Sequence, residues 1–194
     1  MPQELTERFL RATAYGNELH LHQKRKGTDI PYVSHLMAVA CIVMEHGGIE
    51  DEAIAAYLHD AAEDQGGRAV LEEIKQKFGD KVAGIVGRCT DAWTNPKPPW
   101  KARKEAYLAH LREEDDPSVL LVSCADKLHN GRSILDDYRV IGERLWKRFN
   151  ADKEEILWYY RSLVAAYRAN GAAPKRLARE LDRVVSEIEF LSRW

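Results

Sequence analysis

Apolar residues recur in this chain at intervals of three and four, and this periodicity constrains the fold more than any other feature. It is clearest near the C-terminus, where charged residues fill the gaps between Leu177, Leu181, Val184, Val185, Ile188 and Leu191. Such spacing places the apolar side chains on one face of an α-helix. Because no segment convincingly alternates apolar and polar residues as a half-buried strand would, the sequence predicts an all-α protein.

The same periodicity divides the chain into a series of predicted helices. They cover residues 6–24, 34–46, 51–64, 68–78, 80–90, 100–112 and 118–138. Two more are expected within residues 152–194, where Asp152 is a candidate N-cap, Asn170 a helix end and Pro174 a helix start. The one extended segment, 94–99, contains three prolines. We therefore expect residues 1–194 to form one domain of about eight to ten helices, the last two packing on the rest.

Charge and composition exclude several classes of protein. The chain carries 29 Lys and Arg against 31 Asp and Glu, a net charge of -2. This balance argues against general binding of nucleic acid, but it does not argue against binding of a small anionic ligand. No apolar run approaches the roughly 18–20 residues of a membrane span, and the N-terminus lacks the layout of a signal peptide. Cys41, Cys89 and Cys124 lie in apolar stretches, so we expect buried free thiols and a cytoplasmic protein.

Four ionisable residues follow an apolar helical run at residues 53–58. They are His59, Asp60, Glu63 and Asp64. Offsets of one, three and four residues place them on one side of the predicted helix. Buried carboxylates need partners, so a positive charge is expected beside them. The alternative is a helix end that emerges into water.

A second apolar run, at residues 119–125, leads into a polar stripe. The stripe consists of Asp126, Asn130, Ser133 and Asp137, at steps of four, three and four. It marks one face of an otherwise core-like helix. The alternative is a solvent-facing edge, with Lys127 and Arg132 nearby.

One further histidine completes a pattern along the chain. If Ser34 caps a helix, His35 lies in its first turn, where a lone histidine is more often structural. Together with His59, Asp60 and Asp126, however, it gives an H…HD…D arrangement. Two imidazoles and two carboxylates suit a divalent first-row metal with open positions for water and substrate.

These residues resemble the metal quartet of the HD-domain phosphohydrolases. The run HDAAED at residues 59–64 is similar to the HDxxED signature of the hydrolase domain in RelA/SpoT-type alarmone enzymes. Two other segments of that domain also have counterparts here. One resembles the RK, PY and H within residues 25–35, and the other resembles ADKLHN at residues 125–130. With few residues after the last motif, the chain looks like the stand-alone small alarmone hydrolases of the Mesh1 type.

The resemblance implies an all-α HD-domain helical bundle and a metal-dependent hydrolase. Its expected reaction removes the 3′-pyrophosphate from (p)ppGpp or from a relative such as (p)ppApp. The implied metal ligands are His35, His59, Asp60 and Asp126, with Mn²⁺ as the ion or another divalent transition metal in its place. Zinc ranks lower because it more often takes four N and S ligands.

The pair Glu63 and Asp64 lies one helical turn beyond two of these ligands. By resemblance, the two carboxylates orient or deprotonate the attacking water. The choice between them stays open, with Glu63 slightly favoured.

A site with four carboxylates would repel a polyphosphate unless cations stand nearby. The first candidates for substrate binding are Lys24, Arg25 and Lys26, joined by Asn130 and Ser133 on the polar stripe. A second basic group lies next to Trp100 and consists of Lys97, Lys101, Arg103 and Lys104. Lys101, Arg103 and Lys104 could contact phosphate, and the alternative is an exposed loop. Residues 27–30 replace a shorter turn found in many alarmone hydrolases, so the base preference is left open.

Two alternatives remain at this stage. One is an HD phosphatase acting on another nucleotide, such as a 5′-nucleotide or NADPH. The other is a non-catalytic nucleotide-binding protein, which the intact quartet argues against. In each case we expect a small nucleotide partner, without a stable nucleic-acid or membrane partner, and the oligomeric state stays open.

Overall fold

The computed structural model describes residues 4–93 and 96–193. Within these ranges the chain forms ten α-helices and one 3-10 helix, and strand-like pairing is limited to a single bridge between Lys24 and Pro31. The all-α prediction is confirmed. In the same ranges, no helix has the length and apolar character needed to cross a membrane. Residues 94 and 95 of the predicted extended segment lie outside the described residues.

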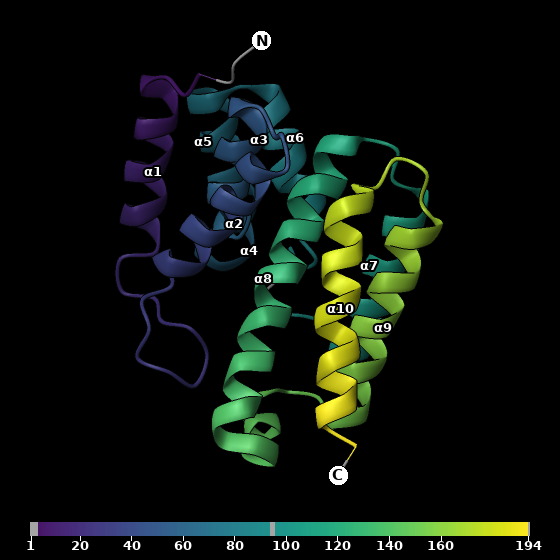
Figure 1. Cartoon of the computed structure of the whole chain (residues 1–194). Coiled ribbons are helices and arrows are strands. Elements are labelled where there is room, and N and C mark those ends of the chain that lie inside the picture. The colour runs from purple at the N-terminus through teal and green to yellow at the C-terminus, as the bar shows by residue number, and fades with distance from the viewer. Residues whose placement is uncertain (1–3, 94–95, 194) are drawn as a thin grey trace.

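The helices form two groups that meet along one long helix (Figure 1). The first group consists of α1 (Glu7–Leu19), α2 (Val33–Glu45), α3 (Glu50–Leu58), α4 (Ala61–Gln65), α5 (Gly67–Phe78) and α6 (Asp80–Cys89). The second consists of α7 (Trp100–Glu113), α8 (Pro117–Ile141), η1 (Gly142–Arg148), α9 (Lys153–Ala169) and α10 (Lys175–Leu191). Helix α8 contacts α2, α3 and α6 on one side and α9 and α10 on the other.

Helix α8 is the central element because almost all of its first half is buried. Asp116 begins it by accepting a hydrogen bond from the amide of Ser118, and Pro117 occupies its first turn. Every residue from 118 to 126 is buried, so this part of α8 has no solvent face. A helix that is apolar all round must lie inside a bundle. Asp126, at the end of this run, is thereby placed in the interior.

The C-terminal helices begin and end as expected. The carboxylate of Asp152 accepts from the amide of Glu155 at 2.8 Å, and α9 ends at Asn170. Pro174 precedes α10. The sequence did not predict the 3-10 turn η1, which lies between α8 and α9.

The prediction of one continuous helix over residues 51–64 is wrong. Helix α3 ends at Leu58 and α4 begins at Ala61, with Asp60 at φ -94° and ψ -4° between them. The ring Nδ1 of His59 bonds to the carbonyl of Ala56 at 2.8 Å, and the hydroxyl of Tyr32 bonds to Asp60 at 2.5 Å. These side-chain contacts hold a turn where the local sequence favours a helix.

Two smaller predictions are also wrong. Ser34 is not the N-cap of α2, because that helix begins at Val33 and the Ser34 hydroxyl donates to the carbonyl of Pro31. His35 nevertheless lies in the first turn, as expected. All three cysteines are free, but Cys41 is exposed because it lies on the outer face of α2 with Met37, whereas Cys124 is buried.

We predict that Gly16→Ala destabilises the protein because α1 crosses α3 at this glycine. A Cβ atom there would lie 2.9 Å from Cδ1 of Tyr57, and such overpacking costs about 1–3 kcal/mol. The control is Gly84→Ala in α6, where a Cβ atom meets nothing within 4 Å. Because alanine favours a helix, this variant should gain about 0.5–1 kcal/mol. Urea unfolding measures both, and equal effects of the two substitutions would contradict the prediction.

Candidate metal centre

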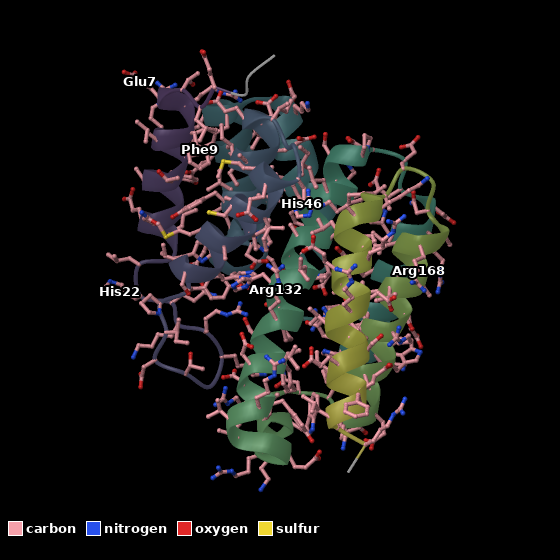
Figure 2. The ribbon with its side chains drawn as sticks, in the orientation of Figure 1. Glu7, Phe9, His22, His46, Arg132 and Arg168 are labelled. Atoms are coloured by element: carbon pink, nitrogen blue, oxygen red, sulfur yellow. The ribbon has the colours of Figure 1, made fainter. Side chains whose placement is uncertain are left out.

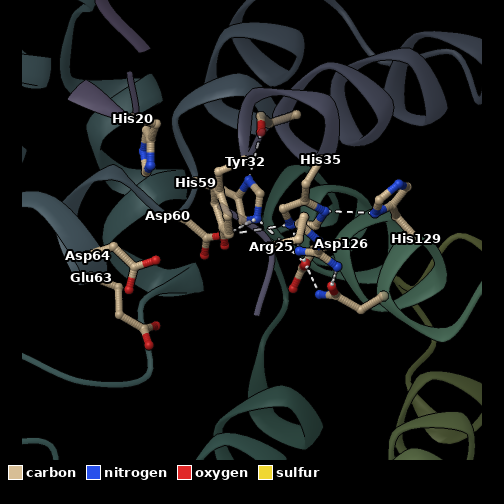
Figure 3. A network of polar contacts seen from close by, with 12 residues as sticks. His20, Arg25, Tyr32, His35, His59, Asp60, Glu63, Asp64, Asp126 and His129 are labelled. Carbon is tan, nitrogen blue, oxygen red and sulfur yellow. Dashed lines mark hydrogen bonds and ion pairs between the residues drawn. The ribbon is translucent and has the colours of Figure 1, made fainter. Parts of the chain in front are cut away.

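Three segments bring the predicted quartet together in the interior (Figure 3). His35 comes from the first turn of α2, His59 and Asp60 from the turn between α3 and α4, and Asp126 from the middle of α8. Nε2 of His35 lies 3.2 Å from Oδ1 of Asp126 and 3.5 Å from Oδ2 of Asp60. Nε2 of His59 lies 3.0 Å from that Asp60 oxygen and 3.5 Å from the Asp126 oxygen. Four potential ligand atoms therefore face one another.

The chemistry of this group fits a divalent cation. Nε2 of His35 and Nε2 of His59 are buried, and neither has a hydrogen-bond partner among the described residues. Suitable atoms of His35, His59 and Asp126 all lie within 4.8 Å of one another. Neutral imidazoles beside carboxylate oxygens are the mixed N and O donors that first-row divalent metals accept.

The carboxylates of the quartet are held by neighbouring side chains. The ammonium of Lys127 donates to Oδ2 of Asp126 at 2.6 Å, and the amide of Asn130 donates to Oδ1 at 2.5 Å. The hydroxyl of Tyr32 donates to Oδ2 of Asp60. Contacts of this kind fix the orientation of metal-binding side chains.

Charge pairing decides the ionisation of Asp126. Burial alone would raise its pKa, but Lys127 and the two histidines hold the pKa of this carboxyl well below its usual value. The effect is reciprocal: burial would lower the pKa of the half-buried Lys127 ammonium, but Asp126 raises this pKa well above its ordinary value. Asp126 is therefore an anion, as a metal ligand must be.

The predicted pair Glu63 and Asp64 lies on α4, on the Asp60 side of the quartet (Figure 3). The ammonium of Lys97 contacts both, at 2.6 Å from Glu63 and 3.1 Å from Asp64. Burial raises the pKa of Glu63, and the nearby carboxylates of Asp91 and Asp60 raise it further. Glu63 is therefore a better proton acceptor than an exposed glutamate.

A polar cavity of about 160 Å³ lies next to the quartet. Its acidic lining includes Asp60, Glu63, Asp64, Asp91 and Asp126. The ammonium groups of Lys104 and Lys127 line it as well. A phosphoryl group in this cavity would thus meet cations and the candidate metal ligands together.

A larger cavity of about 570 Å³ adjoins it, because Tyr32, Asp64 and Asn130 line both. Five of the residues predicted to bind substrate line the larger cavity: Lys24, Arg25, Lys26, Asn130 and Ser133. The guanidinium of Arg25 donates to Asn130 at 2.6 Å and lies 5.6 Å from the centre of the Tyr32 ring. The structure therefore brings the first basic group and three residues of the polar stripe, Asn130, Ser133 and Asp137, to one cavity.

The residues of the second basic group contact different parts of the fold. Lys104 lines the small cavity and, with Arg103, binds the carboxylate of Asp91 at 2.5 and 2.6 Å. Lys101 instead lies over the ring of Trp158 on α9, 3.1 Å from its centre. Of the three predicted phosphate contacts, only Lys104 is thus among the residues that line a described cavity.

Sequence reasoning missed several residues around the centre. Lys127 lies inside the ADKLHN motif. Because lysine is usually exposed, the sequence alone indicates a solvent-facing position for it. Tyr32 lies inside the PY motif, but the motif does not indicate which residue the Tyr32 hydroxyl contacts. Asp91 stands outside every motif and periodic segment, and no sequence signal identifies it. Lys97 belongs to the second basic group, but no sequence signal indicates its contacts with Glu63 and Asp64.

The sequence and the fold are similar to those of known proteins. The model of the HD domain family matches residues 12–149. A protein of Xenopus tropicalis named guanosine-3′,5′-bis(diphosphate) 3′-pyrophosphohydrolase MESH1 is 38% identical over 129 residues, which are 65% of this chain and 69% of that protein. A protein of Aquifex aeolicus named guanosine-3′,5′-bis(diphosphate) 3′-pyrophosphohydrolase is 35% identical over 128 residues. The matched region there is 66% of this chain but 18% of the longer Aquifex protein.

One solved structure resembles the whole chain. It is described as a metazoan ortholog of SpoT that hydrolyses ppGpp, and it has a TM-score of 0.76 and 22% sequence identity. The superposition covers 96% of this chain and 98% of the other. It includes the C-terminal helices that lie beyond the family match, and it shows a shared fold.

We predict that Asp91 stabilises the fold in a pH-dependent manner. Burial would raise its pKa, but Lys104, Lys127 and Arg103 lower it from 3.8 to about 2. A carboxyl whose pKa is depressed by folding contributes stability above its unfolded pKa and loses it as the pH falls through the folded pKa. The contribution is about 2 kcal/mol, lost between roughly pH 5 and pH 2.

Asp91→Asn should therefore be less stable than the wild type at pH 7, and the difference should shrink as the pH falls through this window. Urea unfolding at a series of pH values measures the difference. A difference that stays constant from pH 7 to pH 3 would contradict the assignment.

Proposed function

Because the chain belongs to the HD domain family, we propose that it is a metal-dependent pyrophosphohydrolase. Its proposed reaction removes the 3′-pyrophosphate of (p)ppGpp or of a related nucleotide such as (p)ppApp. The observation that carries this proposal is the convergence of His35, His59, Asp60 and Asp126 beside a cavity lined by cations. Relatives whose names state this reaction support it. We take residues 1–194 as one such domain.

The proposed ligands are Nε2 of His35, Nε2 of His59 and one oxygen each of Asp60 and Asp126. When bound, a divalent ion would lower the pKa of water and draw negative charge from the phosphoryl oxygens. Mn²⁺ is the ion that we favour, because two carboxylates and two imidazoles contain none of the thiolate ligands typical of structural zinc.

The side chains of α4 prepare the attacking water. Glu63 is the proposed general base, because burial raises its pKa toward the range in which a carboxylate accepts a proton efficiently. Lys97 holds Glu63 and Asp64 in place, and the amide of Gln23 donates to Asp64 at 2.9 Å. Asp64 therefore orients the water, while Glu63 takes its proton.

The site must also stabilise the negative charge on the products as they separate. Water attacks the phosphorus attached to the 3′-oxygen, the bond between this phosphorus and the 3′-oxygen breaks, and pyrophosphate leaves. Lys104 and Lys127 line the small cavity and can neutralise charge on the pyrophosphate. The 3′-oxygen regains a proton as the nucleoside hydroxyl. The proton that Glu63 removes from water balances this step.

The larger cavity is the proposed site for the rest of the nucleotide. Arg25 offers a planar cation beside the Tyr32 ring, a surface on which a base or a phosphate can bind. Lys26 approaches from the loop and donates to Asn150 at 2.7 Å. The volume of about 570 Å³ lies in the range of small-molecule sites.

We predict that the purified protein with Mn²⁺ releases pyrophosphate from 3′,5′-polyphosphates of guanosine or adenosine. A panel of these nucleotides, together with 5′-nucleotides and NADPH, is scored for pyrophosphate and for orthophosphate. Release of orthophosphate alone, from other nucleotides, would replace the proposal with a different phosphatase. Asp60→Ala should abolish both Mn²⁺ binding and turnover, whereas the exposed Asp80→Ala should change neither.

We predict that Glu63→Gln retains Mn²⁺ but loses at least about 100-fold in kcat, the usual scale for loss of a general base. Asp64→Asn should lose less, because that side chain only orients the water. Steady-state kinetics with a parallel Mn²⁺ titration separates the two effects. The opposite order of losses would assign the base to Asp64.

A further inference from the structure

A histidine outside the predicted quartet contacts one of its members. Nδ1 of His129 on α8 lies 2.7 Å from Nδ1 of His35, and the two ring centres are 4.8 Å apart (Figure 3). His35 is fully buried, whereas His129 is partly exposed and lines the larger cavity. A short contact between two ring nitrogens requires one to donate and the other to accept.

The surroundings of His35 determine which nitrogen donates. Its Nε2 faces Oδ1 of Asp126 and Oδ2 of Asp60, where a metal ligand must present a lone pair. The proton of the neutral ring therefore belongs on Nδ1. His129 must accept that proton through its own Nδ1 lone pair, which leaves the second proton of the pair on Nε2 of His129.

The other imidazole of the quartet is held differently. Nδ1 of His59 lies 2.8 Å from the carbonyl oxygen of Ala56, and a carbonyl can only accept a hydrogen bond. The backbone of α3 thus fixes the tautomer of His59. His35 has a side chain in the corresponding position, so the orientation of His35 depends on the identity of residue 129.

We propose that His129 is a positioning residue that fixes the tautomer and ring orientation of His35 toward the metal. This inference rests on the proposed function of the centre. His129 acts through His35 and does not touch the ion. Partners of this kind typically change metal affinity by about 10- to 100-fold when they are removed.

The test compares two substitutions that differ in the position of an acceptor. Asparagine places its amide oxygen close to the position of Nδ1, so His129→Asn should keep the hydrogen bond to His35. Leucine has no acceptor, so His129→Leu should weaken Mn²⁺ binding by about 10- to 100-fold. His46→Leu is the matched control, because His46 lies at the far end of α2 and its Nδ1 bonds to the carbonyl of Ile42 (Figure 2).

Two measurements read the outcome without any assay of turnover. Titration followed by the signal of free Mn²⁺ gives the affinity, and the visible absorption spectrum of bound Co²⁺ reports the geometry of the ligands. We expect wild-type values for His129→Asn and His46→Leu, and a weaker affinity with an altered Co²⁺ spectrum for His129→Leu. If His129→Leu does not fold, His129→Gln replaces it, because its acceptor lies farther along the side chain.

The results separate this inference from the proposed function. If the wild type binds Mn²⁺ and His129→Leu binds it equally well with the same Co²⁺ spectrum, the role of His129 is overturned while the metal centre stands. Equal weakening in His129→Asn and His129→Leu would also overturn it, because the size of the ring and not its acceptor would then matter. A wild type that binds neither ion would overturn the metal centre itself.

Discussion

The convergence of one buried and one half-buried carboxylate on two buried imidazoles is the constraint on which the rest of this structure depends. A carboxylate withdrawn from water must be paired or hydrogen-bonded, and Asp126 meets this need through Lys127 and Asn130. Asp60 meets it through Tyr32. The two histidines come from the first helix group, and each has Nε2 within 3.5 Å of Oδ1 of Asp126 on α8, so the two groups meet at this point. Fully buried apolar residues around the centre, such as Leu36, Leu58 and Ala125, supply the packing that holds them there.

The turn between α3 and α4 is the local feature of the backbone that makes this arrangement possible. The turn brings Nε2 of His59 within 3.0 Å of Oδ2 of Asp60. It also starts a new helix, whose first turn presents Glu63 and Asp64 to Lys97. One turn therefore positions two of the candidate metal ligands and the acidic pair.

The sequence predicted the parts of this site that repeat or form motifs. The helix pattern and the polar stripe of α8 follow from spacing, and the quartet follows from residue types in a known order. The break at His59 was not predictable, because residues 53–64 all tolerate a helix and the turn depends on Tyr32, a distant contact. Asp91 and Lys97 have roles only through ion pairs across the fold. Lys127 is half-buried against expectation, because its ammonium contacts Asp126 and the Tyr107 ring.

The net charge of -2 does not describe the site, where many charged side chains of both signs lie close together. A divalent ion would therefore change the local sum of charges. Around the small cavity stand the carboxylates Asp60, Glu63, Asp64, Asp91 and Asp126. Their cationic partners are Lys97, Arg103, Lys104 and Lys127. With neutral histidines, five negative charges against four positive ones leave the centre at -1. With both histidines neutral as ligands, a divalent ion would bring the sum to +1, which favours binding of a pyrophosphate group. The basic residues Arg25 and Lys26 line the larger cavity and stay outside this balance, which leaves their charge for the remaining phosphates of the nucleotide.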